Sequence, residues 1–403
     1  AIEGKIKFPD TLEIIPNYAF YKCSITGLEF GKNLREIGEH SFQSNSLTGT
    51  LIIPNTVEFI HDYAFYFCSS ISQLNLSYSL REIGSNAFYR SGITHDITIP
   101  NLVTKIGDYA FYNSNNCRFL VFGQNVKSIG QCAFQGLYKC HGPLILPDTV
   151  ETIGDYAFSG CSSLNYLRLG DNVNYIGDHA FFNCYSFKGL SRIPSKLCTL
   201  GSYAFNNCSR MVCDVVIPNT VYSIEEYTFY NCKSMRSLKL GNNVNKTNRY
   251  SFAFCTGLTE LSPLPDSLVI IAENSFDGCS SINSSLTIPS SVTSIENYAF
   301  RRCSSIPSLT FKPNSNLKSI GRYAFDNCYD LKNALTIPDS VSSIGSYAFR
   351  GCSNLTGTLT LSKSLKTINT YDFAHCYNIT RIAFNDNITS IESYAFYNCS
   401  KLV

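Results

Sequence analysis

The phrase Tyr-Ala-Phe, or a close variant of it, recurs along the whole 403-residue chain. Alignment on its Phe gives 17 copies at spacings of 22 to 25 residues, nearly all of them 23 or 24. A fixed period of this length is typical of a solenoid, in which no repeat buries its apolar face alone. We therefore expect one continuous array over residues 1–403. The aligned residues are Phe20, Phe42, Phe65, Phe88, Phe111, Phe134, Phe158, Phe181, Phe205, Phe229, Phe252, Phe276, Phe300, Phe325, Phe349, Phe373 and Phe396.

Each repeat contains the same short elements, as the copy from Leu359 to Cys376 illustrates. It begins with Leu-Thr-Leu, an alternation that is typical of a short strand with two inward side chains. A polar residue three before the Phe, such as Asp155, is expected to cap a short helical turn that carries Ala, Phe and Cys inward. The sequence thus predicts an α/β repeat solenoid, a curved rod roughly 80 Å long with a parallel β-sheet on its concave face and short helical turns on its convex face.

This repeat resembles a known family. The phrase L-x-I-P-x-S-V-x-x-I-G-x-Y-A-F-x-x-C-S-x-L is nearly complete from Leu335 to Leu355 and is similar to the BspA-type leucine-rich repeat. The resemblance covers essentially the whole chain. It implies a cell-surface or extracellular protein that adheres to host, matrix or partner proteins, although a repeat scaffold by itself fixes shape and not ligand.

Composition narrows the classes of partner. Charged residues make up 15% of the chain and the net charge is +2, with no basic or acidic run, so we expect neither nucleic acid nor an anionic membrane as the main partner. No run of eighteen apolar residues is present, so no membrane insertion of this segment is predicted. The chain starts and stops abruptly without a visible signal peptide, and we interpret it as a fragment of a longer protein.

Two departures from the template carry information. Copies often alternate between an Ile-Pro form, such as Ile99-Pro100, and a Leu-Gly or Phe-Gly form, such as Leu169-Gly170, which indicates a duplicated doublet of about 47 residues. Two copies, at residues 190–193 and 261–264, are one residue longer than L-x-L. We predict β-bulges at these two places.

Thirteen of the 18 cysteines lie three residues after a template Phe, and Cys117 and Cys140 lie six after it, so all fifteen occupy inward positions. Stacked repeats are roughly 5 Å apart, a distance that a disulfide permits. Repeats related by translation, however, have neighbouring Cα–Cβ bonds parallel rather than directed toward each other, and a disulfide cannot form in that geometry. We therefore predict buried thiols that act as small hydrophobic groups. The sequence contains no C-x-x-C motif, so zinc binding is not predicted. Cys132, Cys198 and Cys213 lie off this column and are the candidates for reactive or paired thiols.

No catalytic motif stands out. H-E-x-x-H, G-x-S-x-G and the glycine-rich phosphate-binding patterns are absent. His40 and His179 replace the template Tyr, and the adjacent Cys140-His141 pair is expected to point apart. The acids recur about once per repeat, as scaffold residues do. We therefore predict no enzymatic activity, no cofactor and no metal site.

The residue between the two inward strand positions is expected to face outward on the concave sheet. In the C-terminal third this residue is mostly Thr, whereas the middle of the array mixes apolar, aromatic and Arg side chains, which are enriched at interfaces. Either these residues bind a partner protein or a second copy, or they merely satisfy strand propensity; both interpretations stay open. The candidate protein-binding residues are Phe119, Val121, Ile145, Tyr166, Arg168 and Val216.

Three functions follow, in order of preference. The first is a non-catalytic cell-surface or secreted module for protein interaction and adhesion, which binds host, matrix or partner proteins through its concave face. The second is a self-assembling filament or surface-layer subunit, because neither end shows a distinctive polar cap. A carbohydrate-binding or hydrolytic protein comes last, because the outward row contains few acids, chiefly Glu29 and Asp214.

Overall fold

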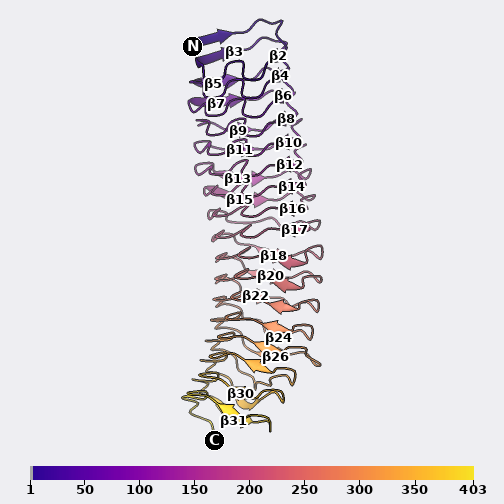
Figure 1. Cartoon of the computed structure of the whole chain (residues 1–403), viewed down its shortest axis with the longest axis vertical. Coiled ribbons are helices and arrows are strands. Elements are labelled where there is room, and N and C mark those ends of the chain that lie inside the picture. The colour runs from indigo at the N-terminus through magenta and orange to yellow at the C-terminus, as the bar shows by residue number, and fades with distance from the viewer. Residues whose placement is uncertain (1–2) are drawn as a thin grey trace. The chain divides into compact units, whose positions relative to one another are not determined.

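The chain is built of coils, each made of short parallel strands joined by turns (Figure 1). The computed structural model describes residues 3–403, and these divide into two compact units, Ala1–Met211 (unit 1) and Val212–Val403 (unit 2). Each template Phe marks one coil. The predicted parallel-strand solenoid of about 17 repeats is therefore confirmed within the described residues.

The first strand of a coil is the L-x-L strand. These strands form separate sheets of two or three strands, such as β1-β3, β13-β15 and β18-β20-β22, rather than one long sheet. The L-x-L strands are β1 (Glu3–Lys7), β3 (Ser24–Glu29), β5 (Gly49–Ile52), β7 (Ile71–Asn75), β9 (Ile97–Thr98), β11 (Leu120–Val121), β13 (Gly142–Ile145), β15 (Leu164–Arg168), β18 (Asp214–Val216), β20 (Ser237–Lys239), β22 (Glu260–Leu261), β24 (Leu286–Ile288), β26 (Leu309–Phe311), β29 (Gly357–Thr360) and β31 (Ile379–Ala383).

A second strand in each coil contains the apolar residue that lies five before the template Phe. The sequence predicts no strand here, but nine of these strands form one parallel sheet in unit 1 and six form another in unit 2. They are β2 (Ile14–Ile15), β4 (Glu36–Ile37), β6 (Phe59–Ile60), β8 (Glu82–Ile83), β10 (Lys105–Ile106), β12 (Ser128–Ile129), β14 (Thr152–Ile153), β16 (Tyr175–Ile176), β17 (Thr199–Leu200), β19 (Ser223–Ile224), β21 (Lys246–Thr247), β23 (Ile270–Ile271), β25 (Ser294–Ile295), β27 (Ser319–Ile320), β28 (Ser343–Ile344), β30 (Thr367–Ile368) and β32 (Ser390–Ile391).

The predicted helical turns are wrong, since residues 3–403 contain no helix. In the coil of Phe300, the backbone φ is +60° at both Tyr298 and Arg302, a left-handed conformation that interrupts a right-handed helix. The backbone N–H of Phe300 donates to the carbonyl of Ala324 in the next coil at 2.8 Å, whereas the N–H of Ala299 donates to Glu296, three residues back. Alternate N–H groups thus bond between coils, and consecutive β-turns replace the helix.

The template Phe side chains form a stacked column in the core. The ring centroids of Phe276 and Phe300 are 5.1 Å apart with planes 3° from parallel, and those of Phe300 and Phe325 are 5.4 Å apart. These rings are almost fully buried. Burial and ring stacking both stabilise each coil against its neighbours, by about 1.5–3 kcal/mol for the burial of one large apolar side chain.

The bulges lie elsewhere than predicted. Register shifts follow four glycines with φ between +71° and +85°, which are Gly4, Gly49, Gly142 and Gly357. Glycine adopts this conformation without strain. At the two longer copies, by contrast, Leu190 keeps only an isolated bridge to Leu167, and residue 261 belongs to β22, an edge strand of its sheet. The extra residue there shortens or ends the strand ladder.

The proline form and the glycine form of the repeat pack closely against each other in the structure. A Cβ atom added to Gly170 would lie 2.1 Å from the carbonyl oxygen of Pro147 in the preceding coil, and one added to Gly123 would lie 2.3 Å from that of Pro100. The backbones approach too closely here for a side chain to fit without movement. The glycine form of the repeat is thus suited to stack on the proline form.

The cysteine column is explained by a hydrogen bond as well as by size. No disulfide links the 18 cysteines, as predicted. The Sγ of Cys303 donates to the backbone carbonyl of Phe276 in the preceding coil at 3.1 Å, and the same contact recurs along the column. Where cysteine is absent, Asn45 donates to Phe20 at 2.7 Å and Ser114 to Phe88 at 3.2 Å. The position therefore favours a small side chain with a donor.

The three cysteines off the column differ in exposure. Cys132 and Cys213 are buried, whereas Cys198 is exposed and its Sγ lies 3.3 Å from the carbonyl of Lys196. Burial raises the pKa of Cys213 to about 12, and that of Cys68 in the column to about 12. A thiol with such a pKa is almost fully protonated at neutral pH and reacts slowly.

We expect Cys198 to be the first thiol modified when the native protein is treated with a maleimide at pH 7.5. Cys198→Ser should remove the fastest phase, whereas modification of the buried thiols of the column, which are all except Cys23 and Cys399, should await unfolding. Peptide mass spectrometry over time measures both. Rapid modification of Cys303 in the native variant would contradict the buried column.

Candidate protein-interaction surfaces

Five of the six predicted binding residues lie in unit 1 and form a surface that we call the unit 1 patch, made of Phe119, Val121, Ile145, Tyr166 and Arg168. Val121 on β11, Ile145 on β13 and Tyr166 on β15 are 49%, 42% and 39% exposed. Within β13-β15, Ile145 pairs with Arg168 and Pro143 pairs with Tyr166. Alternation along each strand therefore turns these residues outward, while Leu144 is fully buried.

The remaining two members of the unit 1 patch are already partly engaged. Arg168 donates from Nη1 to the carbonyl of Leu146 at 3.0 Å and from Nη2 to Asp148 at 2.8 Å, so its charge is paired. Phe119 is half-buried, with its ring centroid 4.4 Å from that of His141. The guanidinium of Arg118 lies 5.7 Å from the Phe119 centroid, within the range of a cation–π contact.

The sixth predicted residue, Val216, lies on β18 in unit 2, where it pairs with Lys239 and is 53% exposed. Val216 is therefore not part of the unit 1 patch. Sequence reasoning did not select Ile52 on β5, although it faces outward in the same way and is 60% exposed. Ile52 borders a 540 Å³ hollow that also includes Asn75 and Thr98, and Thr98 pairs with Val121 of the patch.

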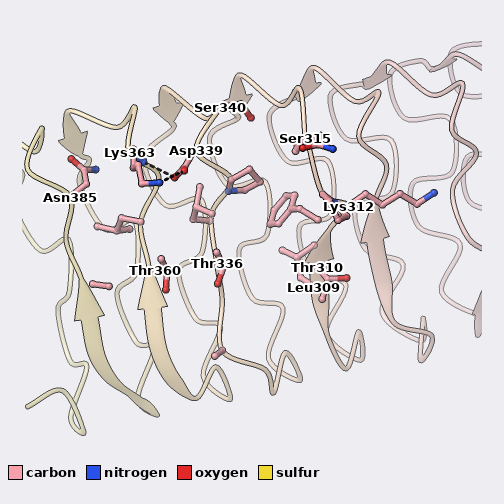
Figure 2. Close-up of a pocket in the computed structure, with 18 of the residues that line it drawn as sticks. Leu309, Thr310, Lys312, Ser315, Thr336, Asp339, Ser340, Thr360, Lys363 and Asn385 are labelled. Carbon is pink, nitrogen blue, oxygen red and sulfur yellow. Dashed lines mark hydrogen bonds and ion pairs between the residues drawn. The ribbon is translucent and has the colours of Figure 1, made fainter.

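A larger groove, of 1010 Å³, lies in unit 2 (Figure 2). It lies over the outward-facing threonines of the C-terminal third, which we call the threonine row. Thr310, Thr336 and Thr360 line the groove, together with Phe311 at the end of β26 and Phe384 directly after β31 in the following coil, and Phe384 is 53% exposed. The signal that sequence reasoning missed is the 25-residue spacing between Phe300 and Phe325, the longest in the chain, which lengthens the turn after β26.

Three of the four charged side chains that line this groove form ion pairs, the exception being Asp386. Lys363 and Asp339 form an ion pair of 2.7 Å on its rim, as the dashed line in Figure 2 shows. Lys312 pairs with Asp266 at 2.5 Å. These ions are largely exposed, so each pair contributes little to stability, and the groove presents mainly apolar and hydroxyl groups between them.

Three buried acids lie in unit 2, away from the strand face. Asp277 accepts two hydrogen bonds from Arg301, at 2.9 and 2.5 Å, and Asp326 accepts two from Arg350, at 2.7 and 3.1 Å. Burial raises the pKa of Asp326 although Arg350 opposes the shift. Bidentate pairs of this kind hold neighbouring coils together.

Asp372 is fully buried without such a cationic partner. Burial, with a smaller contribution from Glu392, raises its pKa from an ordinary 3.8 to about 8, against hydrogen bonds from backbone groups. The flanking coils carry alanine at this position, Ala348 and Ala395. Asp372 is thus a substitution in the scaffold that folding must keep protonated at neutral pH.

Asp372→Ala is expected to stabilise the protein near pH 8, by about 1–3 kcal/mol, because a buried polar group is replaced by the residue of the flanking coils. Because the pKa of Asp372 is raised in the folded state, its favourable contribution to the free energy of unfolding is complete below pH 4. This contribution is lost as the pH rises through about 8. Urea unfolding at several pH values measures this. A gain in stability that does not grow from pH 4 to pH 8 would contradict the assignment.

Two kinds of site are absent from the part of the chain that the structure describes. Within residues 3–403, no group of three or more His, Cys, Asp or Glu side chains is placed to hold a metal ion. No helix able to cross a membrane is found there either.

Stacked parallel coils of this kind, with a period of 22 to 25 residues, define a leucine-rich-repeat protein. The family described as BspA type Leucine rich repeat region matches six overlapping stretches, residues 3–118, 47–142, 93–212, 127–259, 211–332 and 270–403. The chain belongs to this family, as its sequence predicted.

Two solved structures are similar to this chain. A leucine-rich repeat protein from Bacteroides ovatus is 22% identical, with a TM-score of 0.52 over 99% of this chain and 85% of that one. A leucine rich cell surface protein from Faecalibacterium prausnitzii is 20% identical over 95% of this chain and 88% of that one, with a TM-score of 0.39. At such identities the similarity to the Bacteroides protein shows the fold alone. No curated protein matches the sequence.

Proposed function

We propose that this chain is a non-catalytic protein-interaction module of a cell-surface or secreted protein, and that it binds a host, matrix or partner protein through the unit 1 patch. Membership of the BspA-type family supports an interaction role, and the surface location is inferred from the family resemblance. The observation that carries the proposal is that Val121 on β11, Ile145 on β13 and Tyr166 on β15 are all exposed, and that β13 and β15 are paired.

The energetics of this row favour binding over simple strand propensity. An exposed aliphatic side chain gains about 25 cal/mol for each Å² that a partner covers. The backbone beneath Ile145 is fixed by β13-β15 pairing, so little conformational entropy is lost when a partner docks. Arg168 is already held by Asp148, which presents its guanidinium in one orientation. Tyr and Arg, the residue types of Tyr166 and Arg168, are enriched at interface hot spots.

The double variant Val121→Asp/Ile145→Asp tests this role. Both side chains are outward, so the fold should survive while a buried interface gains two unpaired charges, and we expect affinity to fall at least tenfold. Binding of the full chain to an array of extracellular-matrix and serum proteins, with the hits quantified by surface plasmon resonance, measures it.

The matched control is Lys239→Asp/Thr287→Asp, which places two acids at outward strand positions of unit 2. It should leave the same affinities unchanged. If wild-type protein bound nothing on the array, or if the double variant bound as well as the control with an unchanged circular dichroism spectrum, the proposal would be wrong. Sedimentation of the same samples tests the filament alternative, for which polymers are expected.

A further inference from the structure

A separate hollow of 370 Å³ lies in unit 2, where the turns lead back toward the L-x-L strands. Its walls are Tyr329 and Tyr377, which stand four residues after the template Phe of two coils and are 48% and 39% exposed. The coil between them places Gly351 and Ser353 in the hollow. We call this arrangement, Tyr329, Gly351, Ser353 and Tyr377, the tyrosine slot.

The width of the tyrosine slot follows from the coil spacing. The template Phe rings of its three coils are 5.2 and 5.4 Å apart, so equivalent side chains two coils apart are separated by about 10 Å. A planar aromatic ligand in contact with both rings needs only about 7 Å between them, at carbon contact distances of about 3.5 Å on each face. A saturated six-membered sugar ring is thicker because hydrogens project from both faces, and it fits the wider spacing.

Gly351 adds no side chain of its own to the floor of the slot, where the Oδ1 of Asn327 lies 2.6 Å from the position that a Cβ atom would take. Its φ is +73°, but the equivalent positions in the flanking coils, Asn327 and His375, have φ of +60° and +62°. The backbone there therefore accepts residues other than glycine. What glycine provides at this position is the absence of a side chain, which would otherwise fill the space between Tyr329 and Tyr377.

The polar groups around the slot favour an uncharged ligand. Arg350 lines the hollow, but its guanidinium is bound on two nitrogens by Asp326, at 2.7 and 3.1 Å. His375 lies beside Tyr377, with 3.3 Å between Nδ1 and the phenol oxygen. Ser353 and Asn327 add a hydroxyl and an amide. Donors and acceptors beside two exposed tyrosine side chains, with the charge of Arg350 compensated, suit the hydroxyl groups and C–H faces of a neutral sugar.

The same residue pattern occurs independently in unit 1. Tyr138 and Tyr185 stand four residues after their template Phe, and Ser162 takes the equivalent position in the coil between them. The two tyrosines are 49% and 47% exposed. Gly160, with φ of +74°, corresponds to Gly351, and a Cβ atom added to it would meet no atom closer than 3.8 Å. Two copies of this residue pattern in one chain would suit a polymer with repeated units.

We propose that the tyrosine slot and its counterpart at Tyr138 and Tyr185 each bind a neutral pyranose ring of a glycan, held between two tyrosine side chains. This binding is distinct from the proposed protein interaction, because it uses none of the residues of the unit 1 patch. The two proposals therefore succeed or fail separately.

The test uses the full chain on an array of neutral hexose and N-acetylhexosamine oligosaccharides, followed by calorimetry with the best hit. We expect two sites per chain for the wild type, one for Tyr377→Ala, and none for Tyr377→Ala/Tyr185→Ala. Gly351→Asn should also leave one site, because it fills the slot with a residue that the neighbouring coil carries at Asn327. Tyr222→Ala, which removes a 62% exposed tyrosine outside both sites, is the control and should keep two.

Three results would overturn the proposal. The wild type fails to bind any neutral glycan at millimolar concentration, or the double tyrosine variant binds as the wild type does. The third is that the protein binds decaproline but no glycan, and that Tyr377→Ala weakens the binding of decaproline. Aromatic grooves also accept polyproline helices, so this result would indicate a peptide site. Equal thermal unfolding of Gly351→Asn and wild type confirms that a loss of binding reflects the slot rather than the fold.

Discussion

The stacking of one coil on the next is the interaction on which the rest of this structure depends. Each template Phe ring packs on its neighbours at about 5 Å, and alternate backbone N–H groups bond to the next coil in place of a helix. A column thiol such as Cys303 closes a further contact to the carbonyl of Phe276. No coil has a core of its own, so stability arises at the contacts between coils.

Because the inward positions are committed to stacking, variation is left to the outward ones. The unit 1 patch differs from the threonine row only in which side chains stand at equivalent strand positions, Val121 against Thr310 for example. The groove over that row follows from a longer turn, and the tyrosine slot from glycine and serine between two tyrosines. Each surface is a local change on a constant scaffold, which is how one fold carries different interactions.

The sequence predicted what depends on period and burial. The 17 Phe positions, the L-x-L strands and the unlinked cysteine column follow from which residues recur. It did not predict the second strand, because one buried residue such as Ile129 gives no alternation to recognise. The prediction of a helical turn was wrong because the backbone at Tyr298 has a left-handed φ. Tyr rarely adopts this conformation, so its presence in the sequence does not indicate it. The groove was missed because a surface hollow depends on how three or four coils lie together.

The most direct test of this account is the free energy of unfolding of Phe300→Ala, measured in urea against Tyr222→Ala. Phe300 lies in the middle of the column in unit 2, between Phe276 and Phe325, whereas Tyr222 is exposed. If stacking of the Phe column holds the coils together, Phe300→Ala loses about 3–5 kcal/mol and Tyr222→Ala almost nothing. A loss below about 1 kcal/mol for Phe300→Ala would contradict it, since the coils would then be held by something other than the ring column.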